Sequence, residues 1–121
     1  MFAEQLVVFY PSHDLAASRD FYERDLGLKL ARDQGSCLIF KVTAQGYVGF
    51  CQHEGKLPQH DGLILTFVSD DVDGIYKYFK SLNIETEAPP KLNEAFQIYH
   101  FFARDPDGYR IEVQRFLEPL E

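Results

Sequence analysis

The chain has 121 residues, of which 45% are hydrophobic, 15% aromatic and 26% charged, so it is long enough for one domain and too rich in core formers to be disordered. A net charge of -7 disfavours binding to the phosphate backbone of nucleic acids. Because no apolar stretch approaches the roughly 20 residues needed to cross a bilayer and the first residues do not resemble a secretory signal, we expect a cytoplasmic protein with neither a nucleic acid nor a membrane as partner.

The first half of the chain predicts a strand, a helix and three more strands. Strand formers at 6–10 end at Pro11, and the apolar positions that follow repeat with helical spacing up to Leu26. Gly27 stands where the end of a helix favours a left-handed residue. Glycine-containing breaks then separate three expected strands, at 28–32, 37–40 and 47–51.

The second half repeats this order after a linker at 53–61. A strand is expected at 63–68, and Asp71 or Ser69 can cap a helix that runs to Leu82. Three strands follow, at 84–86, 97–103 and 109–116. The sequence therefore predicts one domain built from two β-α-β-β-β units, at about 4–53 and about 62–117.

Two segments carry a resemblance to a known family: the pattern DLxxxxxFYxxxLG at 14–27 and the closing DPDGYRIE at 105–112. With the two units, they make the whole chain similar to the vicinal oxygen chelate superfamily, which includes glyoxalases, extradiol dioxygenases, fosfomycin-resistance transferases and bleomycin-binding proteins. The resemblance implies an α+β fold in which a curved mixed sheet forms a half-barrel around a cavity. That cavity commonly holds a divalent metal.

The metal ligands that the resemblance implies are mostly missing from this sequence. The family positions on the first, fourth and fifth strands fall on Val7, near Gly49 and on Leu63, and only Glu112 on the eighth strand matches. A single carboxylate cannot supply the three or four ligands that a bound divalent metal requires. We therefore expect no metal cofactor, with an atypically held metal as the alternative.

The turn at 105–109 predicts the register of the last two strands. Proline at its second position and Gly108 favour a three-residue hairpin loop, which places Phe102 opposite Glu112 and His100 opposite Gln114. Strand alternation then puts these side chains on one face of the sheet, together with that of Arg110.

His100 and Glu112 are the candidate catalytic residues, since a carboxylate beside an imidazole is suited to proton transfer or to ligand anchoring. The residues alone favour a solvated sheet face, with Arg110 in a surface ion pair. The resemblance instead directs the Glu112 face into the cavity.

Several further residues are predicted to contact a ligand. Alternation from Val7 and Leu63 places Phe9 and Phe67 on the face of the missing ligands, so an apolar pocket is expected there. The predicted ligand-binding residues are Phe9, Cys51, Phe67, Phe102 and Arg110.

The two cysteines, Cys37 and Cys51, show no metal-binding spacing and are expected to be free thiols. Cys51 shares a strand face with His53, which would suit a thiolate nucleophile. The alternative is a small buried hydrophobic residue.

Two functions compete on this basis. The first is a metal-independent protein of the bleomycin-resistance type, which binds a hydrophobic or aromatic small molecule and forms a homodimer. The second is a lyase or isomerase in which Glu112 and His100 exchange protons with a carbonyl substrate. A third alternative is a purely structural module, whose role would not require a polar cluster on a concave face.

Overall fold

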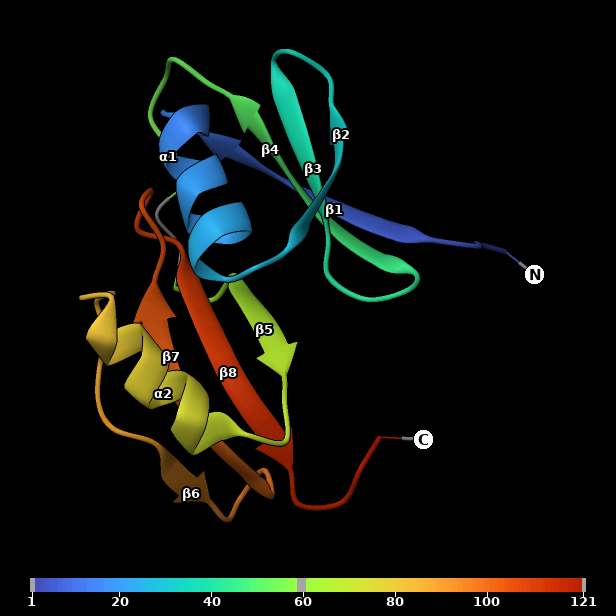
Figure 1. Ribbon diagram of the computed structural model, residues 1–121. Helices are drawn as coiled ribbons and strands as arrows, with labels where there is room; N and C mark the ends of the chain where they lie inside the picture. Colours follow the sequence, from blue (N-terminus) through green and yellow to red (C-terminus); the bar gives the residue numbers. More distant parts are fainter. Residues whose placement is uncertain (1, 59–60, 121) are drawn as a thin grey trace. The chain divides into compact units, whose positions relative to one another are not determined.

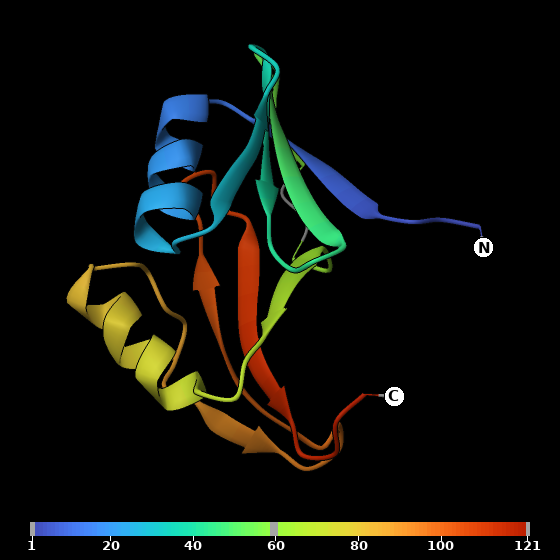
Figure 2. The same cartoon turned by 45° about the vertical axis from the view of Figure 1, so that its right-hand side comes forward.

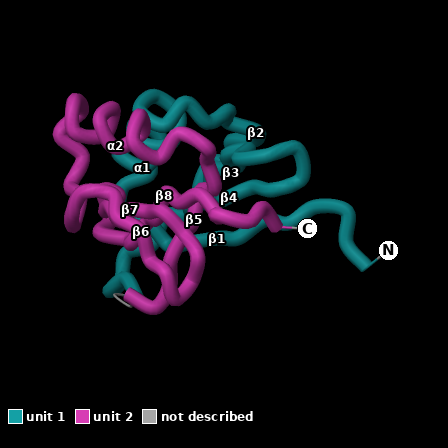
Figure 3. Tube along the Cα trace, turned by 90° about the horizontal axis from the view of Figure 1, so that it is seen from below, with its two compact units in different colours: residues 1–58 teal, residues 59–121 magenta. Residues whose placement is uncertain are grey.

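The computed structural model describes residues 2–58 and 61–120. The chain divides into two compact units, Met1–Pro58 and Gln59–Glu121, which we call unit 1 and unit 2. Figure 3 shows them in separate colours, and each is described by itself below.

Unit 1 is a four-stranded mixed sheet with one helical segment (Figure 1). The strand order is β1-β4-β3-β2, in which β1 runs parallel to β4 and the other pairs are antiparallel. Its elements are β1 (Leu6–Ser12), α1 (Leu15–Arg19) with a π-helical continuation (Asp20–Asp25), β2 (Lys29–Asp33), β3 (Cys37–Lys41) and β4 (Gly46–Gln52).

The helical segment formed by α1 and its π-helical continuation ends just before Gly27, as the sequence predicts. The Asp14 side chain accepts a hydrogen bond from the Ala17 amide at 3.1 Å, and Gly27 adopts a φ of +74° beyond the last turn. The fully buried Tyr22 belongs to the π-helical continuation, and its ring lies 4.5 Å from that of Phe50 and 6.0 Å from that of Phe40. These rings define the helix side of the sheet in unit 1.

The cysteines are not free thiols. Cys37 on β3 and Cys51 on β4 are directly opposite each other, with their Cα atoms 4.0 Å apart, and they form a disulfide. They lie on the sheet face away from α1, because their neighbours Leu38 and Phe50 occupy the helix side. The expectation of free thiols was wrong, and the disulfide leaves Cys51 no thiolate to act with His53.

Unit 2 repeats the architecture with the strand order β5-β8-β7-β6. Strand β5 runs parallel to β8, and the remaining pairs are antiparallel. Figures 1 and 2 both show α2 lying over one face of this sheet. The elements are β5 (Ile64–Val68), α2 (Val72–Ser81), β6 (Lys91–Asn93), β7 (Ile98–Arg104) and β8 (Arg110–Phe116).

The packing of α2 fixes which face of this sheet is the core. The Asp71 side chain caps the helix by accepting from the Gly74 amide at 2.9 Å. The ring of Phe101 on β7 contacts those of Tyr76 and Phe79 on α2, at centroid distances of 5.2 and 5.5 Å. Alternation therefore turns the neighbours of Phe101, which are His100 and Phe102, to the face away from α2.

The strand expected at 84–86 is found later in the chain. Glu85 and Glu87 do form backbone hydrogen bonds with β7, and Thr86 forms an isolated bridge with Ala103. The regular strand, β6, begins only at Lys91. Pro89 and Pro90 separate the two pieces because proline has no N–H group to donate to a ladder.

Both units match the predicted α+β class and the β-α-β-β-β order. Each sheet is mixed and open, with one helical segment over one face. Among the described residues, neither helix combines the length and the apolar character that crossing a membrane would take.

Candidate functional site

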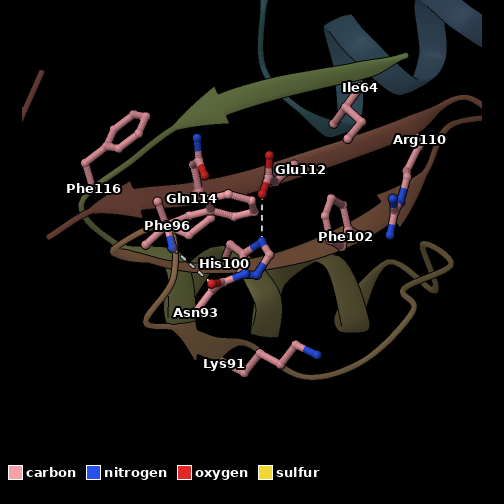
Figure 4. A pocket seen from close by; sticks show the side chains of 11 residues that line it. Ile64, Lys91, Asn93, Phe96, His100, Phe102, Arg110, Glu112, Gln114 and Phe116 are labelled. Atoms are coloured by element: carbon pink, nitrogen blue, oxygen red, sulfur yellow. Dashed lines mark hydrogen bonds and ion pairs between the residues drawn. The ribbon is translucent and has the colours of Figure 1, made fainter. Parts of the chain in front are cut away.

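A cavity of about 570 Å³ lies on the face of the unit 2 sheet that is opposite α2 (Figure 4). We call it the unit 2 cavity. Its floor comes from β7 and β8, and its rim comes from β6 and from the segment that joins β6 to β7. The lining residues are Ile64, Lys91, Asn93, Phe96, Ile98, His100, Phe102, Arg110, Glu112, Gln114 and Phe116.

The predicted hairpin register is confirmed. Phe102 pairs with Glu112 and His100 pairs with Gln114 across β7 and β8. The loop closes through a hydrogen bond from the Asp105 amide to the Tyr109 carbonyl, with Gly108 at a φ of +86°. This turn is what brings an imidazole and a carboxylate from separate strands to one place.

Glu112 and His100 form a buried hydrogen-bonded pair, seen as a dashed line in Figure 4. His100 Nδ1 lies 2.6 Å from Glu112 Oε2, and the two residues are only 5% and 7% exposed. The Thr66 hydroxyl donates to the other carboxylate oxygen, Glu112 Oε1, at 2.8 Å. Both oxygens of the carboxylate are thus bonded, which offsets the cost of burying it.

The second ring nitrogen of His100 is different. Nε2 is buried. Among the buried side-chain nitrogen and oxygen atoms of the described residues, it is the one that lacks a hydrogen-bond partner. A hydrogen bond from Nδ1–H to a carboxylate selects one tautomer of the ring and holds its orientation. A buried polar atom without a partner costs free energy, so Nε2 is a ready attachment point for a polar group entering the cavity.

Arg110 and Phe102 form one edge of the cavity. The guanidinium carbon of Arg110 lies 3.6 Å from the centre of the Phe102 ring, a cation–π contact. The same guanidinium donates two hydrogen bonds to Glu87, at 3.0 and 2.9 Å. Arg110 is therefore held flat against the ring, and its charge is paired.

The family of the chain follows from a comparison with known protein families. Residues 5–113 match the model of the Glyoxalase/Bleomycin resistance protein/Dioxygenase superfamily. The chain belongs to this superfamily. No curated protein matches the chain.

Solved structures of this superfamily and of other proteins share the fold. A glyoxalase/bleomycin resistance protein/dioxygenase from Nocardioides is 17% identical, with a TM-score of 0.80 over 98% of this chain and 86% of its own. The fosfomycin resistance protein FosX from Listeria monocytogenes is 15% identical, with a TM-score of 0.76 over 95% of each chain. An integron cassette protein from the mobile metagenome of the Halifax Harbour sewage outfall is 19% identical, with a TM-score of 0.81 over 93% and 97%.

The position of Phe67 differs from the prediction. Thr66, not Phe67, is the partner of Glu112 on β5, whereas Phe67 pairs with Val113 and so lies on the α2 side. The superfamily position mapped onto Leu63 shifts by one residue as well, since Ile64 lines the cavity. Phe102 and Arg110 are on the predicted face.

Phe9 and Cys51 lie in unit 1. Phe9 pairs with Gly49 on the face away from α1 and is 50% exposed, and Cys51 is bonded to Cys37 on the same face. A Cβ atom added to Gly49 would come within 2.5 Å of the Phe9 ring, so this glycine makes room for the phenylalanine. Neither residue is among those that line the unit 2 cavity.

The residues present do not fit the metal centre of the superfamily. Valine, glycine and isoleucine occupy three of its positions, at Val7, Gly49 and Ile64. Within residues 2–58 and 61–120, no group of three or more His, Cys, Asp or Glu side chains could hold a metal ion. The remaining family ligand, Glu112, already accepts hydrogen bonds from Thr66 and His100.

The sequence did not point to four polar or aromatic residues that line the cavity: Lys91, Asn93, Phe96 and Phe116. It also did not point to Thr66, whose hydroxyl bonds to Glu112. Lys91 and Asn93 belong to β6, which the sequence placed seven residues too early. Two prolines in succession at 89 and 90 were the available sign that the edge strand restarts after them.

Proposed function

We propose that the unit 2 cavity binds a small organic molecule, with an apolar or aromatic body and a polar group that bonds to His100, without a divalent metal. One observation carries this proposal: a buried Nε2 without a partner among the described residues, on a residue that lines the cavity. A bound polar group would remove the cost of leaving that nitrogen unbonded.

The size and lining of the cavity support the same proposal. Its volume of about 570 Å³ falls within the range of small-molecule pockets. Three aromatic rings, those of Phe96, Phe102 and Phe116, contribute to its walls, as Figure 4 shows. A flat apolar body would gain contact area there, while the polar groups at His100 would orient it.

The proposal is tested by NMR titration of the labelled protein with a panel of aromatic fragments that carry hydroxyl, amide or carboxylate groups. We expect amide shifts that cluster on β6, β7 and β8, and a loss of binding in His100→Leu. His13→Leu is the matched control, since its imidazole bonds to the Gly55 carbonyl in unit 1. No binding at millimolar concentration, or shifts confined to unit 1, would contradict the proposal.

A second candidate function is proton transfer, as in a lyase or isomerase. The geometry that favours it is the chain of hydrogen bonds from Thr66 through Glu112 to His100. A carboxylate that holds one ring nitrogen leaves the other without a partner, and a substrate bound against that nitrogen could transfer to it a proton from a carbon next to a carbonyl group. A measurement of hydrogen exchange can distinguish proton transfer from binding alone.

Proton transfer exchanges a hydrogen atom of the substrate with solvent, whereas binding alone does not. With 2-hydroxyacetophenone in D₂O, an enzyme of this kind would incorporate deuterium next to the carbonyl group, and His100→Leu would not. Binding of this probe without deuterium incorporation above the rate in buffer would exclude proton transfer to it and leave the binding function in place.

We also propose that the protein acts as a homodimer. The support lies in β1, an edge strand of its sheet, where apolar residues such as Leu6 and Val8 are 66% and 42% exposed. Exposed edges of this kind are usually covered by another chain.

A further inference from the structure

Lys91 is the direct cross-strand neighbour of His100, whose Nε2 atom lacks a partner among the described residues. The register of β6 and β7 sets Lys91 opposite His100, and that of β7 and β8 sets His100 opposite Gln114. The three side chains form a row on the cavity face, with Cβ atoms of adjacent members about 5 Å apart. A group bound at His100 Nε2 is thus within reach of the lysine side chain.

The charged side chains that line the cavity have described hydrogen-bond partners, except for this lysine. Glu112 is bonded to His100, and Arg110 is paired with Glu87 through two hydrogen bonds. Lys91 is exposed, lines the cavity, and makes neither a hydrogen bond nor an ion pair with another described residue. In a chain with a net charge of -7, the cavity rim therefore carries one unmatched positive charge.

We propose that the ligand of the unit 2 cavity is an aromatic hydroxy acid: its carboxylate pairs with Lys91 and its hydroxyl group bonds to His100 Nε2. This inference rests on the proposed binding function and names the class of ligand. A hydroxyl group fits the site because it can either donate to a ring nitrogen or accept from it.

The charged residues of the cavity also argue against ligands that are not monoanions. A dianion such as a phosphate ester would bring more negative charge than one lysine can match, with Glu112 and Glu87 close by. A cation would meet Lys91 and Arg110 at the rim. A neutral molecule would leave the lysine unpaired, so it would bind more weakly than the matching monoanion.

The experiment compares 3-hydroxybenzoate with two relatives, the neutral 3-hydroxybenzamide and benzoate, which lacks the hydroxyl group. Dissociation constants come from NMR titration at low salt. Because pairs at exposed lysines are worth little, we expect the acid to bind about three- to tenfold more tightly than the amide. Raising the salt concentration should weaken binding of the acid and leave that of the amide unchanged.

Variants separate the two contacts. Lys91→Met keeps the apolar stem of the side chain, so it should bring the acid to the affinity of the amide without affecting the amide, and Lys91→Glu should weaken the acid further. Lys80→Met, on the exposed surface of α2, is the matched control and should change neither affinity. The advantage of 3-hydroxybenzoate over benzoate should disappear in His100→Leu.

Each outcome is decisive. Equal affinities for acid and amide in the unmodified protein, or an unchanged acid affinity in Lys91→Met, would overturn the hydroxy-acid assignment and leave the binding function standing. If none of the three probes binds while other fragments do, the hydroxy-acid assignment fails and the binding function stands. If no fragment of any charge binds, the binding function fails with it.

Discussion

Glu112 depends on two donors from two different strands. Thr66 on β5 and His100 on β7 lie on either side of β8, and each bonds to one oxygen of the carboxylate. A hydrogen bond to a charged group contributes more than a neutral one, and a buried acceptor left unbonded costs still more. The pair is therefore structural as well as part of the proposed binding site, and substitutions should be interpreted for both effects.

Thr66→Val tests the structural part. The change keeps the shape of the side chain and removes the hydroxyl donor to Glu112, so we expect the free energy of unfolding to fall by about 1–2 kcal/mol. Urea denaturation measures this. Thr86→Val is the control, because the described part of the chain shows no hydrogen bond from the Thr86 side chain; an equal loss in both variants would contradict the role given to the Thr66 hydroxyl.

Glu112→Gln tests which nitrogen of His100 carries the proton. The glutamine can present its oxygen to Thr66 and its NH₂ group to Nδ1, which must then accept, so the ring hydrogen should move to Nε2. We expect the ¹⁵N chemical shifts of the two ring nitrogens to exchange their order in NMR spectra. Unchanged shifts would mean that Glu112 does not select the tautomer.

The sequence could predict contacts within a hairpin but not those across a parallel pair. Phe102 was correctly placed opposite Glu112, and His100 opposite Gln114, because a short turn sets the offset of β7 against β8. Phe67 was placed on the wrong face because the offset of β5 against β8 depends on how the long connection between them packs, which no local motif specifies. A one-residue error in such an offset exchanges the two faces of a strand.

At the scale of elements, helix ends and tight turns were predicted well, whereas the register of β3 and β4 was not. Asp71 caps α2, one of the two caps that the sequence offered, because a capping residue acts on its own neighbours. The cross-strand disulfide between Cys37 and Cys51 was missed, since it requires the register of β3 and β4, set by the loop between them. The local sequence of either cysteine holds no sign of it.

Reduction of the disulfide should destabilise unit 1. A crosslink that closes a loop of this length, between cysteines with a sequence separation of 14, stabilises a fold by about 2–3 kcal/mol. We expect dithiothreitol to lower the free energy of unfolding by that amount, and the Cys37→Ala/Cys51→Ala double variant to be insensitive to it. Two alkylated cysteines in the untreated protein, seen by mass spectrometry, would contradict the bond.

The disulfide also bears on location. Structural disulfides persist mainly in oxidising compartments, because the cytosol keeps thiols reduced. The bond between Cys37 and Cys51 therefore weighs against the cytoplasmic location expected from the sequence.

For the molecule as a whole, the internal repeat was the most informative signal in the sequence. Equal spacing of caps and aromatic residues in the two halves predicted two units of the same order, and the family match over residues 5–113 agrees with it. A repeat of this kind indicates the fold, and one fold can support many different activities. The ligand had to be argued from side chains in one cavity.

The proposed homodimer is a property of the whole molecule. Light scattering at micromolar concentration should give twice the mass of 14.0 kDa. Val8→Lys, which puts a charge on the exposed β1 strand, should shift the protein to a monomer, and Leu92→Lys, at another exposed apolar position, should not. A monomer before any substitution would remove the role proposed for β1.

The two prolines before β6 limit how molecules of this protein can polymerise. Strands add to one another through exposed N–H and C=O groups, and Pro89 and Pro90 delete two consecutive donors from this margin of the sheet. Only the three residues Lys91–Asn93 remain as a regular template, and one of them is a charged lysine. Fibre-like growth by sheet extension is therefore blocked on this side, so the rim that carries Lys91 and Asn93 stays open to small molecules even in concentrated solution.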